Sequence, residues 1–184
     1  MIFRSDDDKN MMDLLKESPS WATPIVDSDA AYSNAPYEDL IDESGEVGHF
    51  KDYEIRESNR SDLNELFFLK DYTLAAAFQY VIDSTNVVNT KLMWNNSKFP
   101  GSFRDIFVNY LLPTFKVIDS DELLTEKGFS FWEKLMREYK NLYFYVYDSN
   151  KKNVSKLQNS DELKNYMGTG HKHEKFWIST TTLI

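Results

Sequence analysis

The chain has 184 residues, 41% of them hydrophobic and 15% aromatic, which is enough to bury the core of one domain with an appendage. It contains no cysteine, which excludes disulfides, thiolate metal sites and a cysteine nucleophile, and it has no apolar run long enough to span a bilayer. The N-terminus lacks the apolar region of a signal peptide, so we expect a cytoplasmic protein with no membrane partner.

The net charge of -9 is unevenly distributed along the chain. Residues 1–48 hold 12 acidic and 3 basic side chains, whereas residues 49–184 hold 18 of each. We therefore predict an acidic N-terminal arm over residues 1–45 and a folded domain over residues 46–184. The folded part has no basic excess to follow a nucleic-acid backbone, so we expect no nucleic-acid partner. The arm could bind a basic protein surface, mimic nucleic acid, or be a solvated leader.

The first half of the chain contains several candidate elements. Residues 10–17 could form a short helix within the arm, and residues 50–55 and 66–69 read as extended segments. Asp71 and Tyr72 mark a turn. Residues 74–82 could form a helix or a strand, and their aromatic and β-branched end favours a strand.

Residues 87–94 have the alternation of a strand, with Val88, Thr90, Leu92 and Trp94 on one face. The polar, proline- and glycine-containing residues 95–101 predict a loop. A helix should follow, because apolar residues then recur at helical spacing until Pro113, which should end the helix at or near Leu112. The residues of this stripe are Phe103, Ile106, Phe107, Tyr110 and Leu111.

Beyond Pro113 the sequence predicts a short buried strand over residues 115–118 and then a helix capped by acidic residues from Asp119 onward. Strands are expected at residues 142–147 and 175–180, with a short helix at 160–167 between them. The helix that follows Asp119 is expected to bury one face, which holds Gly128, Phe131, Trp132, Leu135, Met136 and Tyr139. These elements predict an α+β fold with a mixed, mostly antiparallel sheet flanked by helices.

The order strand, glycine loop, helix, strand, helix, strand, strand resembles the second half of the GCN5-related N-acetyltransferase (GNAT) fold, particularly its divergent members in bacteriophage genomes. The family's loop motif, Gln/Arg-x-x-Gly-x-Gly/Ala, matches here at Lys98 and Gly101 and departs at Phe103, where a bulky residue replaces a small one. The resemblance implies acetyl-CoA as cofactor, its pyrophosphate held by backbone amides of Gly101, Ser102 and Phe103. Lys98 or Arg104 would add positive charge.

A second family pattern, Ala-x-x-Phe-Tyr-x-Lys-Leu-Gly, aligns with residues 128–136. In the family its tyrosine often protonates the departing CoA thiolate. Here Trp132 occupies that position, and an indole cannot donate a proton in that role. On their apolar helical stripe, Phe131 and Trp132 are expected to belong to the core.

Asp119 and Asp121 follow a predicted strand and could serve as a general base toward an amine, although capping of the next helix is the simpler interpretation. His171 and His173, with Glu174 or His49, could bind a metal, but a solvated loop is favoured and we predict no metal site. Two functions therefore remain open: an acyl-CoA-dependent N-acyltransferase acting on an amine, or a non-catalytic bacteriophage accessory or structural protein on the same scaffold. In either case a protein partner could bind through the acidic arm.

Overall fold

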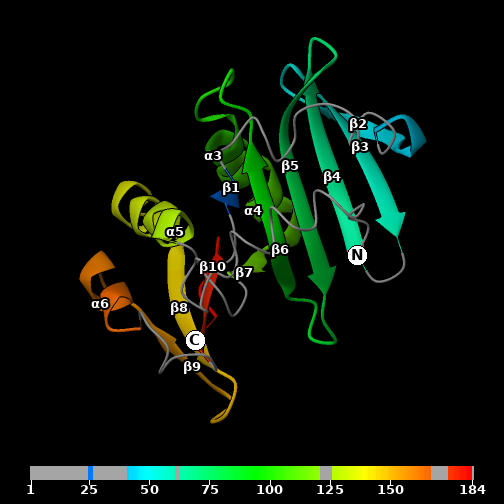
Figure 1. Cartoon of the computed structure of the whole chain (residues 1–184). Coiled ribbons are helices and arrows are strands. Elements are labelled where there is room, and N and C mark those ends of the chain that lie inside the picture. The colour runs from blue at the N-terminus through cyan, green and yellow to red at the C-terminus, as the bar shows by residue number, and fades with distance from the viewer. Residues whose placement is uncertain (1–24, 27–40, 61–62, 121–125, 167–173, 184) are drawn as a thin grey trace. The chain divides into compact units, whose positions relative to one another are not determined.

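The structure, a computed structural model, describes residues 25–26, 41–60, 63–120, 126–166 and 174–183 (Figure 1). Contacts divide the chain into two compact units, one of which is Ile25–Lys116, while the other contains Val117–Ile184. Both units combine strands with helices, which confirms the α+β class. The predicted arm lies mostly outside the described residues, as do Asp121, His171 and His173. The predicted domain boundary at residue 46 stays a prediction.

The unit Ile25–Lys116 is built on a meander in which each strand pairs antiparallel with the next. These strands are β2 (Gly45–Phe50), β3 (Tyr53–Arg60), β4 (Leu63–Lys70), β5 (Thr73–Ile82) and β6 (Val88–Asn95). The two-residue strand β1 (Ile25–Val26) runs parallel to β6, so the sheet is mixed. The strand preference inferred for residues 74–82 is confirmed, and its register places Phe78 opposite Leu66 and Met93.

A helical run follows β6 and packs its aromatic side chains on this sheet. It comprises α3 (Ser102–Ile106), a π-helical turn η1 (Phe107–Leu111) and α4 (Leu112–Phe115). The ring centroid of Phe78 lies 6.4 Å from those of both Phe103 and Phe115. These contacts fix the helical run against β5.

The prediction that Pro113 ends the helix near Leu112 is wrong, because the helix continues to Phe115. Pro113 follows directly on the π-helical turn, in the first turn of α4. Because the π-helical turn is wider than an α-helical turn, it changes which backbone carbonyl faces the proline ring. Proline is tolerated at such a position near the start of a helix. Phe115 was also assigned wrongly to a strand. Its ring packs from α4 against Tyr80, with 4.9 Å between centroids.

The other unit contains a four-stranded antiparallel sheet in the described residues, in the order β7-β10-β8-β9. Its elements in chain order are β7 (Val117–Asp119), α5 (Glu126–Glu138), β8 (Tyr143–Asp148), β9 (Asn153–Lys156), α6 (Ser160–Lys164) and β10 (Glu174–Ser179). The side chains of Ile118, Phe176 and Ile178 are buried in its core. Tyr145, one of three tyrosines on a face of β8, is fully buried, which supports a packing role for it.

Helix α5 buries the apolar stripe that its sequence predicts. Trp132 and Leu135 are fully buried, and Met136 is nearly so. Phe131 and Tyr139 differ from the prediction, because both are only partly buried and Tyr139 follows the end of α5. Phe129 instead contributes to the core, with its ring 6.3 Å from that of Phe176 on β10.

Candidate functional site

The loop between β6 and α3 is the site that the sequence points to for a cofactor. Gly101 is the residue before α3 and has a φ of +82°, a left-handed conformation that favours glycine. A Cβ built on Gly101 would meet no atom within 4 Å, so the conformation, not the space, calls for glycine here. Lys98 is exposed, and its amide donates to Oδ1 of Asn96 at 2.9 Å.

Two of the three amides expected to hold pyrophosphate, those of Ser102 and Phe103, already donate hydrogen bonds within the loop. The Ser102 amide donates to the carbonyl oxygen of Phe99 at 3.1 Å. The Phe103 amide donates to Oδ1 of Asn95 at 2.8 Å. A phosphate could reach either amide only by displacing its present acceptor, so the loop does not fit a preformed pyrophosphate cradle.

The side chain of Phe103 points into the core. It is 5% exposed, and its ring centroid lies 5.9 Å from that of Phe107. Arg104, the last predicted cofactor residue, is partly exposed. Asp105 beside it forms an ion pair with Lys51, with Nζ and Oδ2 2.6 Å apart, which places an acidic group at this end of α3.

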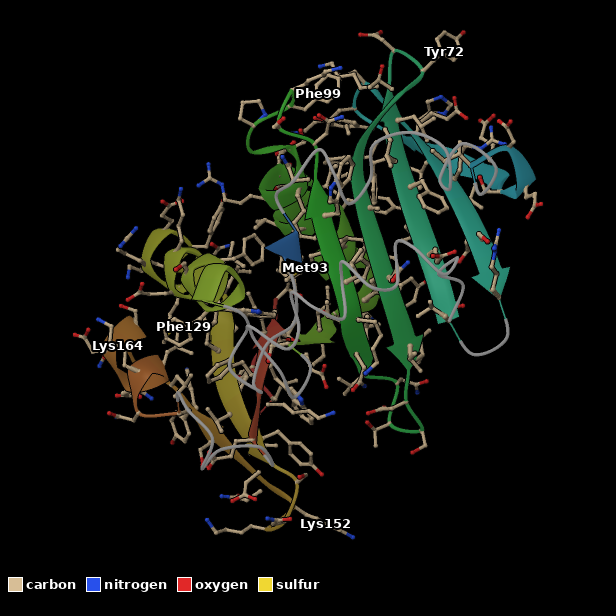
Figure 2. The ribbon with its side chains drawn as sticks, viewed as in Figure 1. Tyr72, Met93, Phe99, Phe129, Lys152 and Lys164 are labelled. Carbon is tan, nitrogen blue, oxygen red and sulfur yellow. The ribbon has the colours of Figure 1, made fainter. Side chains whose placement is uncertain are left out.

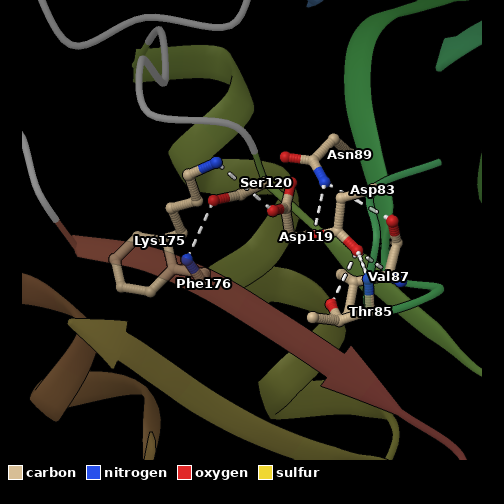
Figure 3. A network of polar contacts seen from close by, with 8 residues as sticks. All are labelled: Asp83, Thr85, Val87, Asn89, Asp119, Ser120, Lys175 and Phe176. Atoms are coloured by element: carbon tan, nitrogen blue, oxygen red, sulfur yellow. Dashed lines mark hydrogen bonds and ion pairs between the residues drawn. The ribbon is translucent and has the colours of Figure 1, made fainter. Parts of the chain in front are cut away.

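Asp119, the predicted general base, ends strand β7 in the other unit. It is 2% exposed, and its Oδ2 lies 3.7 Å from Nζ of Lys175 on β10 (Figure 3). Its neighbour Ser120 is held by two hydrogen bonds: its amide donates to the Phe176 carbonyl, and its Oγ accepts from the Phe176 amide. A general base must contact the proton that it removes. Because the Asp119 carboxylate is buried, an amine substrate has little access to it.

The turn between β5 and β6 carries the Asp83 carboxylate, which was not among the site residues predicted from the sequence. Oδ1 of Asp83 accepts hydrogen bonds from the amides of Thr85 and Val87 and from the Thr85 hydroxyl, and Oδ2 accepts from Asn89 (Figure 3). Burial alone would raise the pKa of Asp83, but these hydrogen bonds outweigh it and lower the pKa below its usual value. The sequence from Asp83 to Asn86, in which serine and threonine follow the aspartate, is typical of an Asx turn and could have indicated this role. The role of Asp83 is structural.

A polar pair also lies under the helical run. The hydroxyl of Tyr80 donates to Oε1 of Glu57 at 3.4 Å. Burial, with the Glu57 carboxylate adding to it, raises the pKa of Tyr80 to about 12. Both effects keep the phenol protonated, so Tyr80 does not have the properties of a base or nucleophile.

No protein-family model, curated protein or solved structure matches this chain. Across the described ranges, no three His, Cys, Asp or Glu side chains gather as a metal ion would require. Nor does any described helix have the length and apolar content of a membrane span. The features of the described chain that bear on its function are therefore the geometry of the loop, the burial of Asp119 and the exposed surface.

Proposed function

We propose that this chain is a non-catalytic interaction protein on a GNAT-like α+β scaffold, of the class of bacteriophage accessory or structural proteins. The observation that carries the proposal is the hydrogen bond from the Phe103 amide to Oδ1 of Asn95. It occupies a donor that acetyl-CoA binding would need, and the side chain of the same residue is buried in the core. Trp132 supports the same conclusion, because it is fully buried where the family has a proton-donating tyrosine.

The alternative is acyl transfer from acetyl-CoA to an amine. Two observations favour it: the left-handed Gly101 before α3, and the exposed charge of Lys98. The order of elements from β6 to β9 is also the order that the resemblance implies, and α6 and β10 follow it. In this alternative Lys98 or Arg104 would bind phosphate, and Asp119 or Asp121 would assist the amine.

Thermal unfolding and calorimetry with acetyl-CoA distinguish the two proposals. A bound cofactor at one hundred times its dissociation constant would stabilise the chain by about 2.7 kcal/mol. We expect no such shift for the natural chain at millimolar acetyl-CoA. Saturable binding that is lost in Lys98→Ala, with Lys91→Ala as the matched control, would instead support the acyltransferase.

The acidic arm, residues 1–45, is a candidate contact for a protein partner. Its charge makes a basic partner surface the complementary one. Binding through the arm should weaken as salt rises, because exposed charges are screened over about 10 Å at 0.1 M ionic strength. An affinity unchanged between about 0.05 and 0.5 M salt would count against the arm as the contact.

A further inference from the structure

We propose that Tyr72 is the anchor through which this chain engages a partner protein that offers an apolar pocket. The inference rests on the proposed interaction function and names the surface that carries it. Tyr72 is 95% exposed, compared with 52% for Val47 and 48% for Ile82, two other exposed apolar residues of the described chain. Figure 2 shows Tyr72 at the tip of the β4–β5 hairpin, with its ring directed away from the sheet.

The backbone conformation of the turn at Tyr72 is one that other residues adopt with less strain than tyrosine. Lys70 pairs with Thr73, so Asp71 and Tyr72 alone connect the two strands. Both have positive φ angles, 50° and 61°. Such a turn favours asparagine or aspartate followed by glycine, and a bulky side chain in the left-handed region is strained. Tyrosine is therefore not explained by the needs of the turn, and strain of this kind points to function.

The hairpin is braced on both sides at its tip. On one side Lys70 forms an ion pair with Asp52 of the β2–β3 turn. On the other side the amide of Asn96 donates to the Ala75 carbonyl at 2.9 Å, and its side chain donates to the Leu74 carbonyl at 2.8 Å. A bulge in the β4–β5 pairing occurs at this point. A braced tip loses little conformational freedom on binding, which favours an anchor residue.

The surroundings of Tyr72 indicate the chemistry of the partner. Two nearby lysines are paired with carboxylates, Lys70 with Asp52 and Lys51 with Asp105. The exposed carboxylate of Asp71 lies next to Tyr72 in the turn, so the surroundings of the ring carry only a small net charge and charge attraction is not the main source of affinity. A phenol ring with a polar end fits an apolar pocket that contains a hydrogen-bond acceptor, and tyrosine is among the residues that dominate protein interfaces.

The strain can be tested without the partner. Tyr72→Gly and Tyr72→Asn both suit the left-handed backbone and remove the ring. Each is expected to raise the thermal midpoint, by about 2–4 °C for each kcal/mol of strain relieved in a chain of this size. Ile82→Asn, at an exposed position in β5 without positive φ, is the control and should produce no rise. A lower midpoint in both Tyr72 variants would show that the ring supports the fold, and would overturn the proposal.

The contact is tested by a photo-crosslinking phenylalanine derivative placed at position 72, in cells that naturally make the chain. The control position is Asn86, which also has a positive φ but lies at the opposite end of β5. We expect a discrete crosslinked protein from position 72 and none from position 86. The purified partner should then bind Tyr72→Asn about thirtyfold more weakly than the natural chain.

The outcomes separate the two proposals. Equal affinity of the purified partner for Tyr72→Asn and the natural chain would overturn the Tyr72 anchor alone. Crosslinks from other exposed positions, such as Val47 and Lys98, without one from position 72 would do the same and leave the interaction function standing. An absence of crosslinks from every exposed position would overturn both.

Discussion

The side-chain amide of Gln79 donates a hydrogen bond to the Glu65 carboxyl across strands β4 and β5, with an N–O distance of 2.6 Å. Both side chains are buried, and Oε2 of Glu65 has no hydrogen-bond partner among the residues that the structure describes. Burial raises the pKa of Glu65 above its ordinary 4.5, although the bond from Gln79 acts in the opposite direction. Glu65 therefore keeps its proton to higher pH in the folded chain than in the unfolded chain.

This relationship predicts a pH-dependent effect of Glu65→Gln. As pH rises above the ordinary pKa of the carboxyl, the unfolded state releases the proton before the folded state does, so Glu65 lowers stability progressively up to its folded pKa. Glu65→Gln removes that charge and should be more stable than the natural chain by roughly 1 kcal/mol near pH 7. The difference should shrink toward pH 4. Urea unfolding of both proteins across this range measures it, and a constant difference would contradict the prediction.

Asp83→Asn should show the opposite pH dependence. The Asp83 carboxylate accepts several hydrogen bonds that hold the β5–β6 turn, and its pKa is lowered. A lowered pKa stabilises the fold above the unfolded value, and this stabilisation is lost as pH falls through the folded value. We expect Asp83→Asn to cost about 1 kcal/mol at pH 7 and less below about pH 4. Ser84→Ala, in the same turn, is the control for a local change without charge, and an equal pH profile for both variants would refute the charge effect.

Lys116→Gly should stabilise the chain. Lys116 has φ and ψ of 66° and −45° after helix α4, a conformation that non-glycine residues rarely adopt. Relief of this strain should exceed the entropy that glycine adds to the unfolded state, for a net gain of about 0.5–1 kcal/mol. Lys134→Gly within α5 is the matched contrast and should cost about 1 kcal/mol. A loss of stability in Lys116→Gly would show that the lysine side chain matters more than the strain.

Replacing Trp132 by the tyrosine of the family motif should not create an acetyltransferase. Trp132 is fully buried in α5, so Trp132→Tyr would place a hydroxyl in the core and lose packed volume. We expect a loss of about 1–3 kcal/mol from the buried hydroxyl alone. Trp132→Phe, which loses volume without adding a hydroxyl, separates the two effects. Transfer of acetyl groups to amines by the tyrosine variant would contradict this expectation.

The sequence predicted most elements because their patterns depend on local periodicity. The alternation through Trp94 identified β6, and the apolar stripe including Trp132 and Leu135 identified α5. The end of the helix at Pro113 was wrong, because the preceding π-helical turn leaves no clear sequence signal. The turn at Asp71 and Tyr72 was predicted, but its left-handed backbone was not, since tyrosine is unusual there.

The interior of the candidate site was less predictable. Gly101 was singled out correctly as a loop residue before a helix, and its left-handed φ agrees with that position. The acceptor for the Phe103 amide was missed, although Asn95 stands where an asparagine side chain can cap nearby amides. A hydrogen bond between residues eight positions apart depends on how the whole loop closes, which periodicity does not report. The burial of Asp119 likewise depends on packing beyond its own strand.

The most direct test of the central claim is nitrogen-15 NMR of the amides of Ser102 and Phe103 during titration with acetyl-CoA. If the loop is closed by Asn95 and Phe99, both signals should remain unchanged at millimolar acetyl-CoA, and both amides should exchange slowly with solvent. Saturable shifts confined to Gly101, Ser102 and Phe103 would contradict the account and support cofactor binding at the loop.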